Sequence, residues 1–229
     1  MSNKKIIIAL DNNDNIEQIL NLVTNLKNEC FAFKIGYEFF FNFGIEGYKL
    51  IESQNVKIFL DFKLHDIPNT IKNGVEAISK LNPFFTTIHI SGGDDMQKAA
   101  IFAKKNINIL GVSILTSLNE QQTEKYYYNK NLKKIVSDFT NYALENNLDG
   151  LVCSPLEVKL VKKIAGDKLI IVVPGIRPMD YKDKNDDQKR YITPQEAINL
   201  GADYLVIGRP ITKAEDPLNS IKQINKSII

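Results

Sequence analysis

Short apolar runs alternate with amphipathic segments along almost the whole chain of 229 residues. The runs are four to eight residues long and rich in Ile and Val, which is typical of strands buried on both faces. Strands that alternate with helices form parallel sheets, because each helix provides the crossover to the next strand. Eight such strands are predicted, at Lys5 to Leu10, Phe31 to Ile35, Val56 to Leu60, Phe85 to His89, Ile107 to Ile114, Gly150 to Cys153, Leu169 to Val173 and Tyr204 to Ile207.

Eight amphipathic segments follow these strands and predict helices with one apolar face. They are Asn15 to Lys27, Tyr37 to Ser53, Thr70 to Leu81, Asp94 to Lys105, Asn131 to Asn146, Pro155 to Ala165, Thr193 to Leu200 and Asp216 to Ile228. Eight strand and helix pairs predict an α/β fold, a (β/α)8 TIM barrel forming a single domain over residues 1–229. A doubly wound sheet is the alternative, but no G-x-G-x-x-G follows the first strand.

The near-balance of positive and negative residues argues against partners that are attracted by a large net charge. Lys and Arg number 29 against 27 Asp and Glu, a net charge of +2, so we expect no nucleic-acid and no membrane partner. No apolar run approaches the ~18 residues that cross a bilayer, and the first strand is too short for a secretory signal. Cys30 and Cys153 lie far apart and are expected to be unpaired. Together these features predict a cytoplasmic protein.

Polar residues collect where the predicted strands end. In a (β/α)8 barrel these carboxyl ends form one mouth, where active sites are built. Two long polar loops, Ser117 to Lys130 and Gly175 to Tyr191, are expected on the same face. The candidate residues are Asp11, Lys34, Asp61, Lys63, His89, Thr116, Pro174, Arg177, Gly208 and Arg209.

Asp61 and Lys63 form the strongest local pattern, since they follow the apolar run Val56 to Leu60 directly. Side chains alternate along a strand, so both are expected to point into one pocket. Buried charges must be paired to be tolerated, and Lys34, inside another apolar run, is a further candidate for this cluster. The cluster predicts a chemical role rather than a packing role.

A second candidate site binds an anion after the eighth strand. Loops after strands seven and eight of such barrels commonly hold phosphate through backbone N–H groups. Gly208 permits close approach and Arg209 supplies a guanidinium, with Arg177 and Gln188 on the facing loop. These residues predict a site for a phosphoester.

The segment Asp61-Phe62-Lys63-Leu64-His65-Asp66-Ile67-Pro68-Asn69-Thr70 resembles the D-x-K-x-x-D-I-P-N-T signature of orotidine 5'-monophosphate decarboxylase of the bacterial type. Further matches run in the expected order along nearly the whole chain. They are Ala9-Leu10-Asp11, Phe33-Lys34-Ile35-Gly36, Leu115-Thr116-Ser117, Val173-Pro174-Gly175-Ile176-Arg177-Pro178, Asp187-Gln188-Lys189-Arg190 and Ile207-Gly208-Arg209-Pro210-Ile211-Thr212.

The resemblance implies loss of CO2 from C6 of orotidine 5'-monophosphate to give UMP, the last step of de novo pyrimidine nucleotide synthesis, without metal or organic cofactor. It implies that Lys63 donates the proton that replaces CO2 and that Asp61 orients Lys63 beside the substrate carboxylate. Lys34, Asp61, Lys63 and Asp66 would form an alternating array of charges. In the family, Asp66 and Thr70 belong to the site of the partner subunit, which implies a homodimer.

The resemblance also assigns the rest of the ligand. Asp11 and Lys34 would hold ribose hydroxyls, and Thr116 would read the pyrimidine edge. Pro174 and Ile67 would form the walls around the ring. The phosphate would be held by Gln188, Gly208 and Arg209, whereas Arg177 would either join them or stabilise its own turn.

Two other functions stay open. A magnesium-dependent sugar-phosphate decarboxylase or aldolase, related to 3-keto-L-gulonate 6-phosphate decarboxylase, would share the barrel and the Asp-x-Lys-x-x-Asp strand. A non-catalytic nucleotide-binding protein would keep the phosphate site alone. The sequence leaves the roles of His65, His89 and Tyr126 to Tyr128 undecided.

Overall fold

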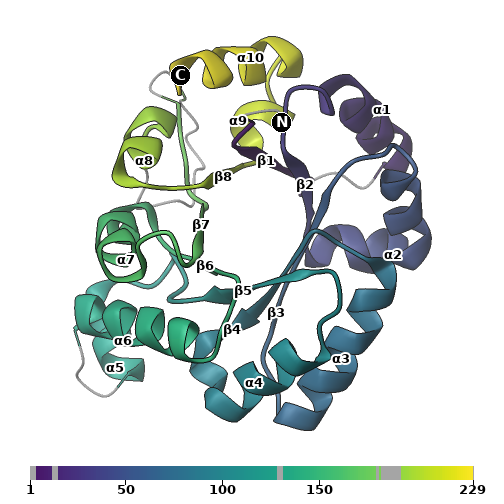
Figure 1. Cartoon of the computed structure of the whole chain (residues 1–229). Helices are drawn as coiled ribbons and strands as arrows, with labels where there is room; N and C mark the ends of the chain where they lie inside the picture. The colour runs from purple at the N-terminus through teal and green to yellow at the C-terminus, as the bar shows by residue number, and fades with distance from the viewer. Residues whose placement is uncertain (1–3, 12–14, 128–130, 179–180, 182–191, 229) are drawn as a thin grey trace.

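The computed structural model describes residues 4–11, 15–127, 131–178, 181 and 192–228. Within them, eight parallel strands pair in chain order, and the eighth returns to the first, which closes a barrel. Figure 1 shows the strands at the centre with the helices around them. The strands are β1 (Ile6–Ala9), β2 (Ala32–Ile35), β3 (Ile58–Leu64), β4 (Phe85–His89), β5 (Asn108–Val112), β6 (Gly150–Val152), β7 (Ile170–Val173) and β8 (Tyr204–Ile207).

Eight helices cover the barrel where the sequence predicts them. They are α1 (Ile16–Leu26), α2 (Tyr37–Glu52), α3 (Pro68–Leu81), α4 (Asp94–Ala103), α6 (Leu132–Glu145), α7 (Val158–Ala165), α8 (Pro194–Leu200) and α10 (Pro217–Ser227). The predicted (β/α)8 barrel is confirmed, and closure between β1 and β8 rules out the doubly wound alternative.

Local sequence explains where the helices begin. The Asn15 side chain accepts hydrogen bonds from the backbone N–H groups of Glu17 and Gln18 at the start of α1. Thr193 and Glu196 form a capping box at the start of α8, where Pro194 occupies the first turn. These caps fix the residues at which α1 and α8 begin.

The core has two layers. Strand side chains that point outward pack against the helices in one large cluster. Those that point inward fill the barrel in a second cluster, made of Ile7, Ala9, Ala32, Phe59, Phe85, Leu110, Val172 and Val206. Because the barrel is filled, only the residues above this second cluster, at the carboxyl ends of the strands, can form a site at the mouth.

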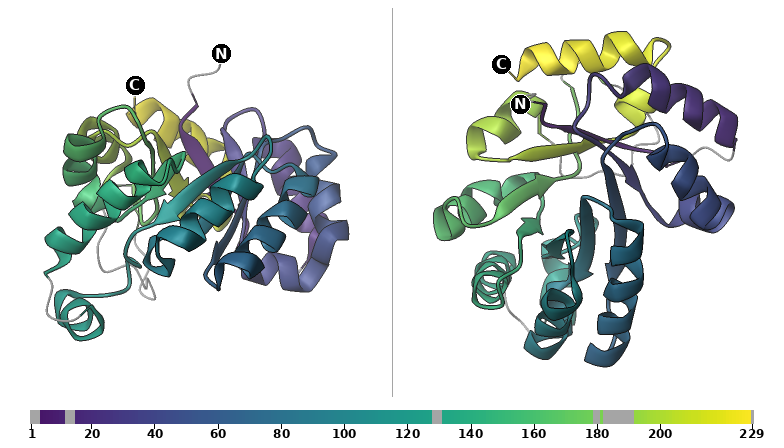
Figure 2. Two further views of the ribbon diagram at one scale, coloured as in Figure 1. Left: turned by 60° about the horizontal axis from the view of Figure 1, so that its bottom comes forward. Right: turned by 45° about the vertical axis from the view of Figure 1, so that its right-hand side comes forward.

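The last helix completes the outer ring beside the first. The side-chain amide of Asn225 on α10 donates to the backbone oxygen of Glu29, after α1, at 2.9 Å. The views in Figure 2 show α10 beside α1 from two further directions. Among the described residues, no helix has both the length and the apolar character that a membrane span requires.

Three predicted details are corrected. The loop Ser117 to Lys130 contains a helix, α5 (Glu120–Tyr126), which begins at a capping box formed by Asn119 and Gln122. The third strand continues through Asp61 and Lys63 to Leu64 instead of ending at Leu60. Additional short helices appear at α9 (Arg209–Thr212), η1 (Ile90–Gly92) and η2 (Pro155–Glu157), where the last replaces the first turn of a predicted helix. Most of the loop Gly175 to Tyr191 lies outside the described residues.

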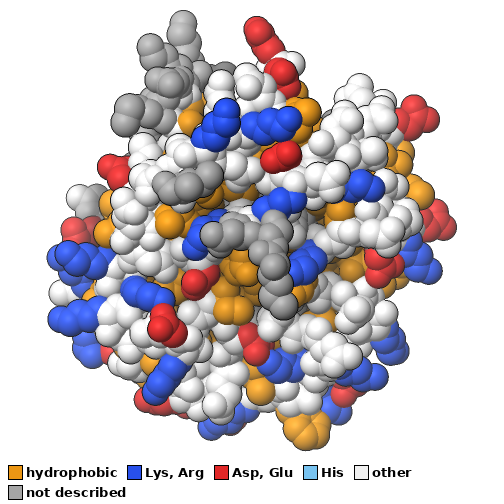
Figure 3. Space-filling view, turned by 45° about the horizontal axis from the view of Figure 1, so that its top comes forward, with side chains coloured by type: hydrophobic (Ala, Val, Ile, Leu, Met, Phe, Trp, Pro, Cys, Tyr) orange, Lys and Arg blue, Asp and Glu red, His pale blue; other side chains and the backbone are white. Residues whose placement is uncertain are grey.

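The surface agrees with the near-zero net charge. Lys and Arg side chains are interspersed with Asp and Glu over the face shown in Figure 3. Cys30 and Cys153 are buried and free, as expected.

Candidate active site

Four charged side chains of alternating sign lie in a row across the carboxyl ends of β1, β2 and β3. We call Asp11, Lys34, Asp61 and Lys63 the charge row. Lys34 Nζ lies 3.2 Å from Asp11 Oδ2 and 3.6 Å from Asp61 Oδ2. Lys63 Nζ lies 2.8 Å from Asp61 Oδ2. The structure therefore brings together these four residues that the sequence singles out separately.

Burial explains why the charge row must be balanced. The side chains of Lys34 and Asp61 are only 11% and 12% exposed. Burial acts to lower the pKa of Lys34, but the carboxylates of Asp61 and Asp11 outweigh it and raise that pKa above its ordinary value. Burial acts to raise the pKa of Asp61, but the ammoniums of Lys34 and Lys63 and hydrogen bonds from Lys63 and Thr87 hold it below its ordinary value. Lys34 and Asp61 therefore both stay ionised although they are buried.

A glycine leaves room for the row. A Cβ atom at Gly36 would lie 3.1 Å from Asp11 Oδ1 and 3.2 Å from Lys34 Nζ. Both distances are tighter than ordinary contact. Gly36 follows β2 directly and so permits the approach of Asp11 to Lys34.

Asp61 and Lys63 lie together as predicted, joined by an ion pair, but simple strand alternation is not the whole reason. The pairing of β3 with β4 shifts between Leu60 and Leu64. Lys63 has a φ of 45°, in the left-handed region that residues with a side chain seldom adopt. The lysine therefore reaches Asp61 from an irregular strand, which a sequence pattern does not reveal.

Thr87 on β4 contacts the charge row and was not among the predicted residues. Its Oγ1 accepts a hydrogen bond from the Lys63 backbone N–H at 2.8 Å and donates to Asp61 Oδ1 at 3.0 Å. One signal in the sequence could have identified it. Thr87 precedes His89 by two residues, so the two side chains share one face of the same strand.

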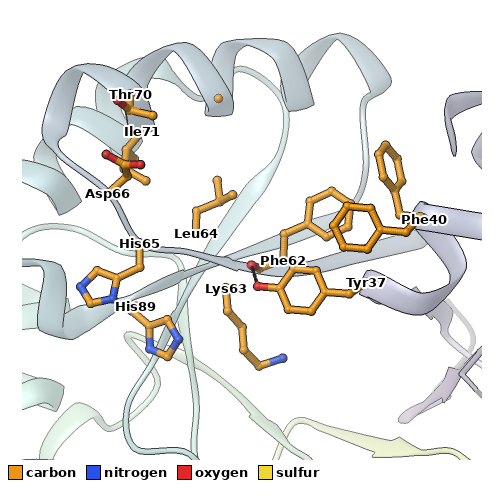
Figure 4. A pocket seen from close by; sticks show the side chains of 12 residues that line it. Tyr37, Phe40, Phe62, Lys63, Leu64, His65, Asp66, Thr70, Ile71 and His89 are labelled. Atoms are coloured by element: carbon orange, nitrogen blue, oxygen red, sulfur yellow. Dashed lines mark hydrogen bonds between the residues drawn. The ribbon is translucent and has the colours of Figure 1, made fainter.

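A cavity of about 590 Å³ opens beside Lys63, between the start of α2, the end of β3 and the start of α3. Aromatic rings form one side of it (Figure 4). Tyr37 stacks on Phe62 and on Phe41, and its hydroxyl donates to the backbone oxygen of Phe62. The other lining residues are Phe40, Leu64, His65, Asp66, Thr70, Ile71, Gly74 and His89.

Asp66, Ile67 and Thr70 lie outside the charge row. All three are exposed, and Asp66 Oδ1 accepts a hydrogen bond from the Ile67 N–H at 2.7 Å. In Figure 4 the Lys63 side chain extends away from Asp66. Within the described part of this chain, Asp66 has no ion pair with Lys63. The predicted four-charge array therefore lacks Asp66 within this chain.

The two histidines of the chain lie together next to Lys63. Their ring centroids are 5.3 Å apart with the planes tilted by 39°. Burial, followed by the neighbouring His65 and Lys63, lowers the pKa of His89, although Asp61 acts in the opposite direction. His89 is therefore a neutral member of the cavity wall near pH 7.

The remaining candidates lie on loops after β5, β7 and β8. Thr116 is half-buried in a turn, and Pro174 is half-buried after β7. Arg177 is buried, donates from Nη1 to the Ile176 oxygen at 3.0 Å and packs over the Tyr181 ring. Gly208 and Arg209 are half-buried at the start of α9. Gln188 lies outside the described residues.

Tyr127 packs against Phe139 of α6, with ring centroids 6.1 Å apart. This contact gives Tyr127 a packing role, which the sequence leaves undecided. Among the described residues, no group of three or more His, Cys, Asp and Glu side chains is arranged to hold a metal ion.

Comparison with known proteins decides the family. Residues 4–224 match the model of the orotidine 5'-phosphate decarboxylase / HUMPS family. The chain belongs to this family.

Relatives of the family cover nearly all of the chain. An orotidine 5'-phosphate decarboxylase of Wolbachia sp. subsp. Brugia malayi (strain TRS) is 42% identical over 97% of this chain and 98% of its own length. One of Staphylococcus saprophyticus is 41% identical over 96% of both chains. The crystal structure of orotidine 5'-phosphate decarboxylase from Lactobacillus acidophilus is 36% identical, covers 98% of this chain and 99% of its own, and superposes with a TM-score of 0.83. The family resemblance carried by residues 61–70 is confirmed.

Proposed function

We propose that the chain catalyses the decarboxylation of orotidine 5'-monophosphate to UMP in pyrimidine nucleotide synthesis, with Lys63 as the proton donor. The observation that supports this most strongly is the charge row, in which Lys63 Nζ lies 2.8 Å from Asp61 at the mouth of a family barrel. An ammonium held by a fixed carboxylate can both stabilise negative charge and give up a proton.

The chemistry explains why fixed charges are needed. When the bond between C6 and the carboxyl carbon breaks, the electron pair stays on C6 and CO2 leaves. That pair occupies an orbital in the plane of the pyrimidine ring, so the π system cannot delocalise it directly. Preorganised positive charge must stabilise it. The Lys63 ammonium stabilises the carbanion and then transfers its proton to C6, which leaves a neutral amine to be reprotonated by solvent.

Asp61 has the role of orienting Lys63. Its Oδ2 accepts from the Lys63 ammonium and lies near Lys34, so the lysine is held before the substrate arrives. The substrate carboxylate would bind beside Asp61, and the repulsion between the two anions is relieved as CO2 departs. Holding the proton donor in this geometry lowers the entropic cost of the proton transfer.

The rest of the substrate is assigned to the mouth of the barrel. Asp11 and Lys34 hold ribose hydroxyls, and Thr116 reads the edge of the pyrimidine. Pro174 and Ile67 flank the ring. Gly208, Arg209 and Gln188 bind the phosphate, where contacts remote from C6 can close the site and exclude water. Arg177, which is buried against Tyr181, supports the loop after β7 and is the weaker phosphate ligand.

A homodimer would complete the site. Asp66 and Thr70 are exposed beside a surface that includes Tyr37, Phe41 and Ile67, which are 51%, 81% and 67% exposed. Large exposed apolar side chains grouped with polar residues are typical of interfaces. A two-fold partner placed here would bring its Asp66 to the Lys63 of this chain. By symmetry, Asp66 of this chain would reach the Lys63 of the partner. The cytoplasmic location and the independence from cofactors stay predictions of the sequence.

The decisive experiment follows the absorbance of orotidine 5'-monophosphate with purified protein, with and without exhaustive EDTA treatment. We expect UMP to form at the same rate in both samples. Complete loss of activity after EDTA, restored by Mg2+, would instead support the metal-dependent relatives. Binding of UMP without any turnover of orotidine 5'-monophosphate would support a nucleotide-binding protein.

The shared site is tested by mixing two inactive variants, Lys63→Ala and Asp66→Ala. Each hybrid dimer has one complete site, since the Asp66→Ala subunit keeps its own Lys63 and receives Asp66 from the other. Full subunit exchange should therefore restore about a quarter of wild-type activity, because half of the dimers are hybrids. The matched control mixes Lys63→Ala with Asp61→Asn, which act in the same subunit and should not complement. Equal failure of both mixtures, with exchange confirmed, contradicts the shared site.

A further inference from the structure

The irregular part of β3 lies opposite a single residue of β4. Leu60 pairs with Thr86 and Leu64 pairs with Ile88. Between these pairs, Asp61, Phe62 and Lys63 of β3 face only Thr87 of β4. In a regular parallel ladder the backbone N–H of Lys63 would bond to a carbonyl of the neighbouring strand. Here it bonds to the Thr87 side chain at 2.8 Å.

The direction of the two hydrogen bonds at Thr87 follows from the groups involved. The Lys63 N–H can only donate, so Thr87 Oγ1 is its acceptor. An ionised carboxylate can only accept, so the Thr87 hydroxyl proton points to Asp61 Oδ1 at 3.0 Å. The other oxygen of Asp61, Oδ2, accepts from the Lys63 ammonium at 2.8 Å. Both ends of Lys63 are thus tied to one carboxylate, the side chain directly and the backbone through Thr87.

This arrangement explains how Lys63 keeps its unusual backbone. A left-handed conformation is unfavourable for a residue with a Cβ, so surrounding bonds must hold it. The hydroxyl of Thr87 supplies such a bond at the residue itself. Thr87 is fully buried, so no water competes for either hydrogen bond.

We propose that Thr87 is a positioning residue that holds Lys63 in its left-handed conformation and fixes the Asp61 carboxylate, so that the ammonium is aligned for proton transfer. The inference rests on the proposed function, in which Lys63 is the proton donor. Thr87 itself does not touch the substrate in this scheme. It acts through Lys63 and Asp61.

The neighbouring threonine provides a matched comparison. Thr86 is on the same strand and equally buried, but its side chain points to the opposite face. Its Oγ1 has no hydrogen-bond partner among the described residues. A general need for threonine in a buried strand would apply to both positions, whereas the proposed role applies to Thr87 alone.

The test compares Thr87→Val, Thr87→Ser and Thr86→Val. Valine keeps the shape of threonine and removes the hydroxyl, so kcat of Thr87→Val should fall on the order of 10²-fold while KM changes little. The acid limb of kcat/KM should move to higher pH, because Asp61 loses a donor that favours its ionised form. Thr87→Ser keeps the hydroxyl and should retain most of the activity. Thr86→Val should match the wild type.

A second measurement does not depend on turnover. Hydrogen exchange of the Lys63 backbone amide, followed by NMR, should be slow in the wild type and in Thr87→Ser but faster in Thr87→Val. Wild-type kcat together with slow exchange in Thr87→Val would overturn the inference. Equal loss in the serine and valine variants would do so as well, since the serine variant keeps the hydroxyl to which the effect is assigned. If the wild type does not convert orotidine 5'-monophosphate, the proposed function fails, while amide exchange still decides whether Thr87 holds Lys63.

Discussion

The two ends of the barrel both carry lysines, but the lysines have different neighbours. At the carboxyl ends of the strands, Lys34 and Lys63 lie against the carboxylates of Asp11 and Asp61. At the amino ends, Lys4, Lys27 and Lys57 line a second cavity of about 490 Å³ together with aromatic rings. Within the described residues, none of these three lysines has a carboxylate within 4.0 Å.

The lysines at the amino ends, which we call the lower end of the barrel, contact aromatic rings and backbone oxygens. Lys57 Nζ lies 4.2 Å and 4.4 Å from the ring centroids of Phe31 and Phe84. Lys27 donates to the backbone oxygen of Gln54 at 3.3 Å, and Lys4 donates to that of Asn28. Phe31 also packs against Tyr204, with ring centroids 4.1 Å apart and planes tilted by 31°, so the rings cover the base of the barrel core.

This difference separates a chemical role from a structural one. At the carboxyl ends, the upper end of the barrel, carboxylates pair with both ammoniums, and those of Asp61 and Asp11 raise the pKa of Lys34. Ammoniums held in this way at the mouth are available to a substrate. Aromatic rings and carbonyls fix the lower ammoniums over a core that they help to cover. The residue type is the same at both ends, and the neighbouring groups decide which role it has.

Substitution at the upper end should have the largest effect. Lys63→Ala should lower kcat by at least about 10³-fold, because it removes the proposed proton donor and, with it, the positive charge proposed to stabilise the carbanion. It should still bind UMP, since the phosphate and ribose contacts are elsewhere. Turnover and UMP binding are measured on the same preparation. Retained turnover in this variant would remove Lys63 from the mechanism.

Acidification should affect the upper end more than the lower end, because His89 lies at the mouth. The folded state lowers the pKa of His89, mainly by burial, so the unfolded chain binds a proton more readily. The contribution of His89 to the free energy of unfolding is therefore present above its unfolded pKa of about 6.5, and it is lost as the pH falls below that value. Between pH 7.5 and 5.5, the free energy of unfolding should therefore decrease less in His89→Gln than in the wild type. Identical decreases, measured by urea unfolding at both pH values, would contradict this assignment.

Substitution at the lower end should have the smallest effect on activity. Lys57→Met keeps an apolar side chain over Phe31 and Phe84 but loses the ammonium. The free energy of unfolding should fall by about 0.5 to 1 kcal/mol, the usual value of an exposed cation–π contact, while kcat stays at the wild-type value. Lys49→Met, at an exposed lysine of α2, is the control and should change stability less. A large loss of activity in Lys57→Met would mean that the two ends are coupled.

The sequence predicts the barrel well, because closure and order follow from eight repeats of one pattern. It also singles out three members of the charge row, since Lys34, Asp61 and Lys63 stand out inside or beside apolar runs. Thr87 escapes notice for the opposite reason. Threonine is a common strand residue. Only the shifted pairing of β3 with β4 lets the Thr87 hydroxyl bond to both the Lys63 backbone N–H and the Asp61 carboxylate.

The helix α5 was missed for a related physical reason. The segment Glu120–Tyr126 is short and polar, and only Thr123 within it is buried, so it lacks the apolar stripe that marks a helix in a sequence. Its capping box, Asn119 with Gln122, was the available signal. The left-handed backbone of Lys63 has no such signal, because it depends on the partner strand.

Pairing of β8 with β1 has a consequence for how the protein is made. A chain emerging from the ribosome cannot close the barrel until residues 204–207 are free to pair with Ile6 to Ile8. Until then β1 and β7 expose unpaired backbone groups, which are sites for aggregation or for chaperones. Asp11 lies two residues after the end of β1, so we expect the charge row to reach its final geometry only with this last pairing. Each newly made molecule should gain its activity in one late step rather than gradually.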